Sequence, residues 1–362
     1  MLRVLHGPVN VGNQPWVLSR YERVCGLRSD LVVNYNTWFG YQADQVLTPL
    51  SRGSVQDKLR RFFFALSVPF RYDVVHYYFG LSFTSWNDYG LKTPLWFRDL
   101  KLARRLGRKV FMTLQGCDVR LSARSADRNR YTPCTIGECA AAKNCRETLD
   151  AQRKFLIDQV IPLVDKTFIL NPELMHYVPG ATFLPYASVD INALRPHYPD
   201  GCKPLTIVHA PSDPSLKGTK YIVEVMERLK KKYEITFKLV QNVPHGEALQ
   251  LYEQADLLID QLLFGWYGGI AVELMALGKP VACYLREEDF GCLPGEMIEA
   301  LPIIRVTKES LESDLERIIA DPDQLGALGR RSREFVERWH NPQRIAAAVA
   351  ECYQSPQLSL RL

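Results

Sequence analysis

The sequence predicts an α/β protein built from two doubly wound, Rossmann-like domains. Its 362 residues are enough for two domains that each bury a core of their own. Short apolar runs of strand length alternate with helical segments in two successive series. Proline and glycine crowd the stretch 196–204 between the two series. We therefore expect domains at 1–200 and 201–338, followed by a C-terminal helical segment at 339–362.

The composition is that of a globular enzyme, with 47% hydrophobic and 23% charged residues. Neither an 18-residue apolar run nor a signal-peptide pattern is present, so we expect a cytoplasmic protein. Residues 1–200 hold 26 Lys and Arg against 17 Asp and Glu, whereas residues 201–362 hold 19 against 23. This basic N-terminal half could meet an anionic acceptor or, peripherally, the inner face of a membrane, although solubility alone also explains it. No nucleic-acid-binding motif accompanies the charge, so we expect no nucleic-acid partner.

The first series opens with a strand at 2–5, a loop rich in glycine and asparagine, and a helix at 16–25. Asn10, Gly12 and Asn13 are then expected at the carboxyl end of the first strand, where open α/β sheets bind ligands. The loop lacks G-x-G-x-x-G, which excludes a standard dinucleotide fingerprint.

Further strands are expected at 31–35, 73–78, 109–114 and 166–170, with helices at 55–66, 94–106 and 147–160. His76 lies in the strand at 73–78, and Gln115 and Asp118 follow the strand at 109–114. These three side chains are candidates to hydrogen-bond a donor or acceptor sugar. For His76, packing at a strand end is the equal alternative.

The helix around 58–66 places Lys58, Arg60 and Arg61 beside three phenylalanines. Such a mixture suits a helix that lies on a membrane surface near a lipid-linked acceptor. The alternative is an ordinary helix with a buried aromatic face and solvated basic side chains.

A cysteine-containing segment at 119–146 shows neither helix nor strand periodicity. A loop of this length inside a compact domain is usually functional or held in place. A structural zinc ion could be held here in tetrahedral geometry by Cys134, Cys139 and Cys145, with Cys117 as a fourth ligand. Free thiols are the alternative, because the spacing lacks a C-x2-C pair and the chain's nine cysteines without an export signal indicate a reducing compartment.

The second series predicts strands at 205–209, 235–240, 257–263, 280–284 and 303–306, separated by helices at 219–231, 245–254, 309–320 and 324–339. Gly268 and Gly269 should open the helix that follows the strand at 257–263. The first N–H groups of this helix, on Gly268, Gly269, Ile270 and Ala271, would then point at an anion. Glu273, one turn later, could reach sugar hydroxyls beside a bound phosphate. The plainer alternative is a tight turn with Glu273 on a solvated face.

Glu273 to Val281, which read ELMALGKPV, resemble the signature E-A-M-A-x-G-x-P-V of retaining GT-B glycosyltransferases of the family-4 type. Lys217-Gly218 resembles the family's K-G setting for the donor diphosphate, and residues 186–190 resemble its N-G-V-D segment. The resemblance implies two Rossmann-like domains that face each other across a cleft, with a C-terminal helix crossing back to the N-terminal domain.

The resemblance further implies transfer of a sugar from a nucleotide-sugar donor, by default a UDP-sugar, to a hydroxyl of a sugar, glycan or lipid-linked acceptor. The anomeric configuration would be retained, and no metal cofactor would be needed for catalysis. Three positions depart from the family pattern: Gly265 stands in the place of the first glutamate, Gln115 in that of a histidine, and residues 212–215 hold no arginine. An inactive sugar-nucleotide-binding protein and a UDP-sugar epimerase of the same fold therefore stay open as alternatives.

Overall fold

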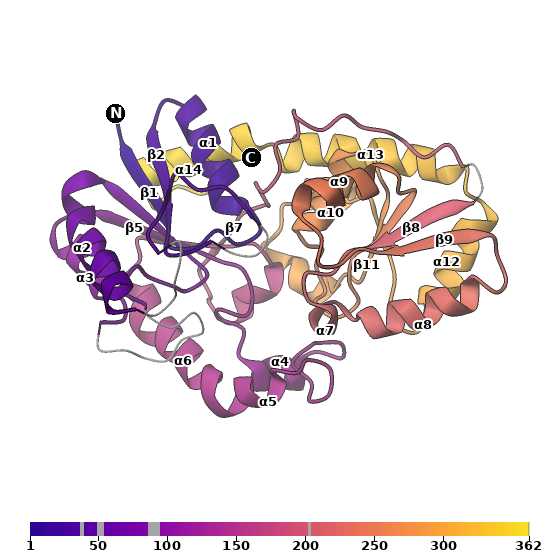
Figure 1. The fold of residues 1–362 in the computed structure, drawn as a ribbon, viewed down its shortest axis with the longest axis horizontal. Coiled ribbons are helices and arrows are strands. Elements are labelled where there is room, and N and C mark those ends of the chain that lie inside the picture. Colours follow the sequence, from indigo (N-terminus) through magenta and orange to yellow (C-terminus); the bar gives the residue numbers. More distant parts are fainter. Residues whose placement is uncertain (37–39, 49–53, 86–94, 202–203, 361) are drawn as a thin grey trace. The chain divides into compact units, whose positions relative to one another are not determined.

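The computed structural model describes residues 1–36, 40–48, 54–85, 95–201, 204–360 and 362. The chain forms two compact units (Figure 1). Unit 1 comprises Met1–Leu121, Asn144–Val189 and Pro342–Leu362, and unit 2 comprises Ser122–Lys143 and Asp190–Asn341. The main part of the second unit thus begins at Asp190 rather than at 201, and most of the cysteine-containing segment belongs to the same unit.

Unit 1 is built on a seven-stranded sheet whose order is β3-β2-β1-β4-β5-β6-β7, and every neighbouring pair is parallel. The strands are β1 Arg3–Gly7, β2 Arg28–Val33, β3 Gln45–Val46, β4 Val74–Tyr78, β5 Lys109–Leu114, β6 Lys166–Ile169 and β7 Thr182–Phe183. All five residues of β4 are buried, as expected for a central strand covered on both faces. Because all the strands are parallel, the loops that follow them meet at one edge of the sheet.

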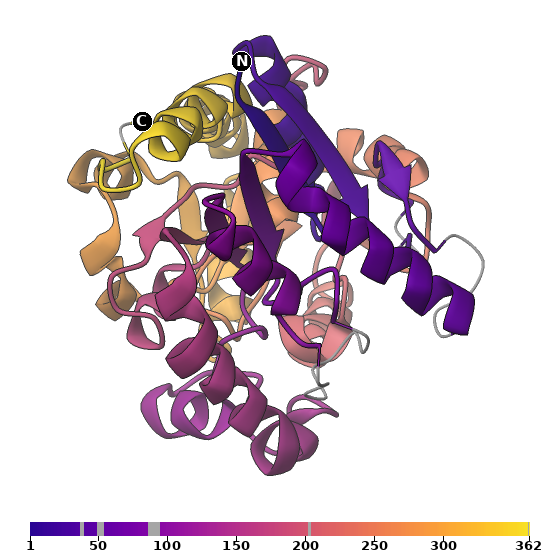
Figure 2. The ribbon, with the colours of Figure 1, turned by 90° about the vertical axis from the view of Figure 1, so that its left-hand side faces the viewer.

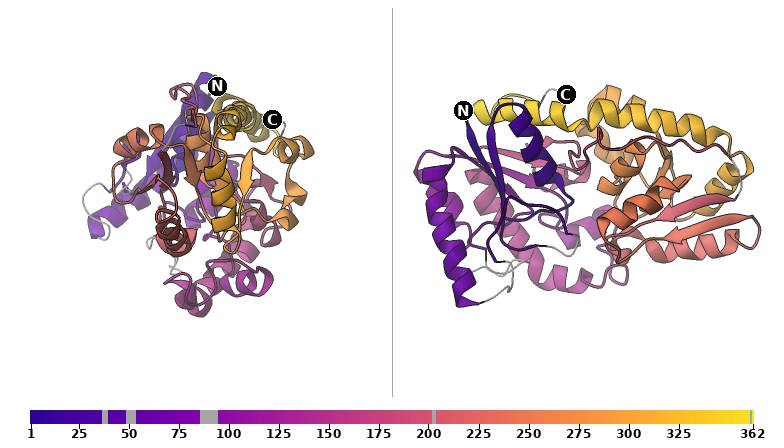
Figure 3. Two further views of the ribbon diagram at one scale, coloured as in Figure 1. Left: turned by 90° about the vertical axis from the view of Figure 1, so that its right-hand side faces the viewer. Right: turned by 45° about the horizontal axis from the view of Figure 1, so that its top comes forward.

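The helices of unit 1 are α1 Gln14–Val24, α2 Val55–Arg71, α3 Arg98–Arg105, α6 Asp150–Phe155 and α14 Pro342–Gln354. The C-terminal helix α14 packs beside α1, as the right-hand view of Figure 3 shows. It supplies Ile345, Val349 and Tyr353 to the same hydrophobic core as Val4 of β1 and Phe111 of β5. The last helix is therefore part of the first unit's core.

Unit 2 is built on a five-stranded parallel sheet of order β12-β11-β10-β8-β9. Its strands are β8 Leu205–His209, β9 Ile235–Leu239, β10 Leu257–Ile259, β11 Val281–Cys283 and β12 Ile303–Arg305. Its longer helices are α8 Thr219–Leu229, α9 His245–Glu253, α10 Gly269–Ala276, α12 Leu311–Ala320 and α13 Gln324–Trp339. The two parallel sheets confirm the predicted pair of Rossmann-like folds.

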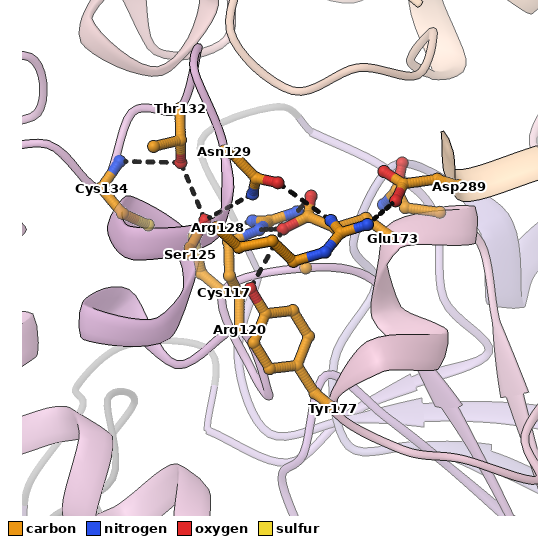
Figure 4. Close-up of polar contacts among 12 residues, drawn as sticks. Cys117, Arg120, Ser125, Arg128, Asn129, Thr132, Cys134, Glu173, Tyr177 and Asp289 are labelled. Carbon is orange, nitrogen blue, oxygen red and sulfur yellow. Dashed lines mark hydrogen bonds and ion pairs between the residues drawn. The ribbon is translucent and has the colours of Figure 1, made fainter. Parts of the chain in front are cut away.

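The segment 122–143 is attached to unit 2 by side-chain contacts with residues far along the chain. Arg128, in the helix α4 Ser122–Arg128, makes a 2.5 Å ion pair with Asp289 (Figure 4). Glu138 makes ion pairs with Lys220 at 3.0 Å and Lys308 at 3.4 Å. Within the segment, Ser125 bonds Thr132 through their hydroxyls at 2.8 Å. The segment is therefore an ordered part of the second unit.

Several predicted elements differ from the structure. The strand expected at 31–35 is β2 at Arg28–Val33, the helix expected at 55–66 continues to Arg71, and the short strands β3 and β7 were not predicted. The strand expected at 257–263 ends at Ile259, and residues 260–268 form a loop instead. The helix expected at 147–160 is α6 with a π-helical turn on each side of it. Among the described residues, no helix has both the length and the hydropathy that crossing a bilayer requires.

Candidate functional site

Lys217 and the start of α10 are brought together in unit 2. Lys217 ends the short helix α7 Pro214–Lys217, whose N-cap residue Asp213 accepts hydrogen bonds from the N–H groups of Ser215 and Leu216. The N–H of Leu262, in the loop after β10, donates to the carbonyl of Lys217 at 3.1 Å. These bonds fix the Lys217 backbone beside the loop that leads into α10.

The absence of a side chain at Gly268 makes room for the Lys217 ammonium. A Cβ atom placed on Gly268 would lie 2.8 Å from Lys217 Nζ, which is closer than side-chain atoms normally pack. The ammonium and the N-terminus of α10 thus share one location, where both favour an anion. This is the arrangement expected from the sequence for a diphosphate site.

An acidic side chain that the sequence analysis did not single out already lies at this location. Asp260 Oδ1 is 2.8 Å from Lys217 Nζ, and Asp260 Oδ2 accepts a hydrogen bond from the Gly268 N–H at 2.6 Å. Its side chain has no exposed surface. Asp260 therefore orients both the ammonium and the first amide of the helix, and a bound phosphate would have to share these donors with its carboxylate.

Of the four predicted amides, two have partners within the protein. The Gly268 N–H donates to Asp260, and the Ala271 N–H donates to the Gly268 carbonyl at 3.1 Å. The N–H groups of Gly269 and Ile270 begin the helix without a partner among the described residues. These two amides are the ones best placed to donate to a ligand.

Glu273 lies one turn into α10, and its carboxylate contacts a histidine. His245 Nε2, at the start of α9, lies 2.6 Å from Glu273 Oε1. This hydrogen bond, opposed by partial burial, raises the pKa of His245. A sugar hydroxyl that binds Glu273 would therefore compete with His245 for the carboxylate.

The predicted residues of the first loop lie in unit 1. Asn10 is buried and its amide donates to the Gln42 carbonyl at 2.9 Å. Asn13 forms the N-cap of α1 in the left-handed conformation, and its amide donates to the Ser188 carbonyl at 3.3 Å. Gly12 precedes it with a φ of 60°. These contacts shape the loop after β1.

Asp118 organises the loop that follows β5. Its carboxylate accepts from the backbone N–H of Gln115 at 2.9 Å and from that of Gly116 at 2.7 Å. Burial raises the pKa of Asp118, although these hydrogen bonds act to lower it. Asp118 also lines a cavity of about 60 Å³ together with Gly80, Trp96 and Arg153. The carboxylate of Asp118 therefore holds the turn at Gln115 and Gly116, beside this cavity.

His76 lies in the core of unit 1. Its side chain has no exposed surface, and its ring nitrogens bond Tyr353 at 2.7 Å and Thr113 at 2.7 Å. Burial holds the pKa of His76 well below its usual value. This placement matches the packing alternative for His76, because neither nitrogen is available to a sugar.

No protein-family model matches the sequence, and no curated protein matches it significantly. Solved structures match it over nearly the whole chain. Sucrose-phosphate synthase from Thermosynechococcus elongatus is 16% identical, with a TM-score of 0.65 over 98% of this chain and 99% of that one. Anabaena HepE, solved with UDP and glucose, is 11% identical, with a TM-score of 0.60 over 98% and 100%. The chain has the GT-B fold.

The same architecture occurs in a further neighbour that is described by a different activity. A protein described as a UDP-N-acetylglucosamine 2-epimerase from Listeria monocytogenes is 12% identical, with a TM-score of 0.54 over 99% of this chain and 97% of that one. The GT-B fold therefore does not by itself distinguish transfer from epimerisation, and the site residues must carry the functional argument.

Gly265 stands where the family pattern has a glutamate, and the structure explains why a glutamate is absent there. Gly265 has a φ of 72°, and a Cβ atom placed there would lie 2.6 Å from Arg286 Cβ. Arg286 is buried and bonds Asp289 at 3.0 Å and the Tyr131 carbonyl at 2.8 Å. Arg286 therefore fills the space beside this backbone position, so that no side chain fits at residue 265.

The four cysteines of the expected zinc site are divided between the units. Cys117 and Cys145 belong to unit 1, whereas Cys134 and Cys139 belong to unit 2. Within unit 1, Arg153 contacts the two cysteines at the ends of the cysteine-containing segment. Its Nε donates to the Cys117 carbonyl at 2.7 Å, and its Nη2 lies 3.3 Å from Cys145 Sγ. The described residues contain no group of three or more metal-ligating side chains. Zinc binding stays a prediction that metal analysis must test.

A buried ion pair lies beside Cys117, whose Sγ is 3.8 Å from Arg120 Nη1. Arg120 pairs with Glu173 at 3.0 Å, and Tyr177 bonds the same carboxylate at 3.3 Å (Figure 4). Neither Arg120 nor Glu173 has more than 3% of its side chain exposed. No sequence spacing pointed to this pair, because its members are 53 residues apart.

Proposed function

We propose that this protein is a glycosyltransferase that moves a sugar from a nucleotide-sugar donor, by default a UDP-sugar, to a hydroxyl acceptor. The observation that carries the proposal is the convergence of Lys217, Gly268 and the N-terminus of α10. A cation and a helix N-terminus at one point stabilise the negative charge that develops on a departing diphosphate.

In this proposal the Lys217 ammonium and the N–H groups of Gly269 and Ile270 bind the diphosphate. Asp260 is a positioning residue, since its carboxylate holds the ammonium at 2.8 Å and the Gly268 amide at 2.6 Å. Glu273 accepts hydrogen bonds from the ribose hydroxyls after His245 has moved aside. Asp118 and Gln115, in the loop after β5, are assigned to the sugar or the acceptor.

We further propose that the product keeps the anomeric configuration of the donor and that catalysis needs no divalent metal. The family resemblance at residues 273–281 supports retention. The Lys217 cation supports metal independence, because it can take over the neutralisation of diphosphate charge that a metal supplies elsewhere.

The test is a transfer assay with a panel of UDP-sugars and acceptors, followed by NMR of the product's anomeric proton. Retention of configuration, with a rate unchanged by brief EDTA treatment, is expected. Inversion, or a loss of activity that magnesium restores, would show that the mechanism is different.

The same assay without acceptor tests the epimerase alternative, which the Listeria neighbour supports. Conversion of UDP-N-acetylglucosamine in the absence of acceptor would favour epimerisation. Nucleotide binding without turnover in either format would favour a binding protein.

A further inference from the structure

The helix α2 carries an apolar stripe on its solvent-facing side. Five large apolar side chains are exposed there: Val55 by 71%, Leu59 by 49%, Phe63 by 63%, Leu66 by 39% and Phe70 by 70%. Their spacings of four, four, three and four residues place them within less than a quarter of the helix circumference, at 3.6 residues per turn. The helix lies at the front of unit 1 in Figure 2.

The opposite side of α2 makes the helix's contacts with the core. Phe64, Ala65 and Val68 are buried, and Phe64 contacts Phe83 with ring centroids 5.1 Å apart. The exposed stripe is therefore not needed to hold α2 on its own unit. Exposed apolar patches of this kind mark interaction sites.

Basic side chains border the stripe. On α2, Lys58 flanks one edge, and Arg60 and Arg71 flank the other, by the same helical geometry. The neighbouring helix α3 adds Arg98, Lys101 and Arg105, whereas its Arg104 forms an ion pair with Asp165. The two acidic residues of these helices, Asp57 and Asp99, are buried. The surface around the stripe is thus positively charged.

A cavity of about 210 Å³ lies between the two helices. Its apolar lining includes Phe62 and Leu66 of α2 and Leu102 of α3. Its charged lining consists of Arg98, Lys101 and Arg105 together with the buried Asp99. An apolar surface with cationic neighbours is complementary to acyl chains beneath anionic headgroups.

We propose that α2 and α3 form a docking surface for a bilayer that contains anionic lipids, with the α2 stripe inserted among the acyl chains and the basic residues at the headgroup phosphates. A second copy of this chain fits less well, because a two-fold contact through the stripe would set cations against cations. The inference does not depend on the proposed function, since no donor-site residue contributes to the surface.

The test is co-sedimentation of the full chain with vesicles of phosphatidylcholine, with and without about 30% phosphatidylglycerol as the anionic lipid. We expect the protein to bind the anionic vesicles and to bind neutral vesicles only weakly. Binding to the anionic vesicles should fall steeply as the salt concentration is raised. The double variant Phe63→Ser/Phe70→Ser should weaken binding at least about tenfold because it removes apolar side chains from the stripe. The double variant Lys101→Glu/Arg105→Glu should weaken binding at least about tenfold because it reverses two charges at the headgroups.

Two matched variants control for these changes. Leu239→Ser alters an exposed apolar residue of β9, and Arg331→Glu reverses an exposed charge on α13. Both should bind vesicles as the parent does, and circular dichroism should show every variant folded. Equal binding to neutral vesicles, or retained binding in either α2/α3 variant, would overturn the proposal. So would a concentration-dependent dimer in analytical ultracentrifugation that Phe63→Ser/Phe70→Ser dissolves, because the stripe would then be a self-contact.

Discussion

The Asp260 carboxylate, without exposed surface, bridges the Lys217 ammonium at 2.8 Å and the Gly268 N–H at 2.6 Å. A buried acid at a helix N-terminus usually serves as a cap, but here it also holds a cation beside the first residue of that helix. The pair sets the position of the charge before any anion binds, which is the condition for electrostatic preorganisation.

Lys217→Ala should weaken UDP binding by about 1.5–3 kcal/mol, the range for a charge-assisted hydrogen bond. This corresponds to roughly a ten- to hundredfold higher Kd in isothermal titration calorimetry. Thermal stability should fall as well, because Asp260 loses its counter-ion, so the titration must be run well below the variant's Tm. Lys230→Ala, which removes an exposed lysine just after α8, is the control. Unchanged UDP and GDP affinity in Lys217→Ala would exclude this residue from the site.

Gly268→Ala should weaken UDP binding and should also lower stability, because the displaced ammonium loses its 2.8 Å contact with the buried Asp260. The added methyl group would meet Lys217 Nζ at 2.8 Å, and the end of a flexible lysine can move away. The ammonium would then leave its position at the helix end. Gly246→Ala is the matched control, since a Cβ atom there meets nothing within 4 Å. If both variants bind UDP equally well, the space at Gly268 has no functional role.

Gly265→Ala should destabilise the fold more than Gly107→Ala. Both glycines have a φ of 72°, so both substitutions incur the left-handed strain of about 1–2 kcal/mol. Only residue 265 adds a clash, 2.6 Å from Arg286 Cβ, whereas nothing lies within 4 Å at Gly107. Overpacking of this kind costs about 1–3 kcal/mol more. Urea denaturation of the two variants measures the difference, and equal midpoints with equal slopes would contradict the crowding at Gly265.

UDP-glucose affinity should rise with pH through the elevated pKa of His245. A histidine whose pKa is raised by Glu273 is charged below that pKa, where its ion pair with the carboxylate is strongest. Deprotonation as pH rises weakens the pair and releases Glu273 to the ribose hydroxyls. UDP-glucose is the probe, because its diphosphate diester does not titrate in this range. His245→Gln should abolish the dependence; an equal slope in that variant would place its origin elsewhere.

Protein purified without added zinc should carry close to one zinc ion per chain if Cys117, Cys134, Cys139 and Cys145 form the expected site. Plasma mass spectrometry measures the metal, and Cys139→Ser should lower its content. Brief chelation should leave transfer activity intact, because the metal would be structural and slow to leave. Protein that is free of zinc would leave only the free-thiol alternative.

The alternation of strands and helices, and the role of Gly268 in opening α10, were predictable from sequence because both depend on local patterns. The sequence could not predict that residues 122–143 belong to unit 2, because ion pairs such as Arg128–Asp289 join positions that are 161 residues apart. Asp260 was missed for a related reason: it lies within a stretch read as one apolar strand, and its role depends on where that strand ends. Periodicity likewise could not show that α2 exposes one of its two apolar faces.

The division of the chain between the units also constrains its synthesis. Unit 1 draws Ile345, Val349 and Tyr353 of α14 into its core, and these residues follow the whole of unit 2 along the chain. Domains generally fold as units while the N-terminal part leaves the ribosome first. Here unit 1 cannot complete its core until α14 has been synthesised, and a stop codon before Pro342 would leave it without its closing helix.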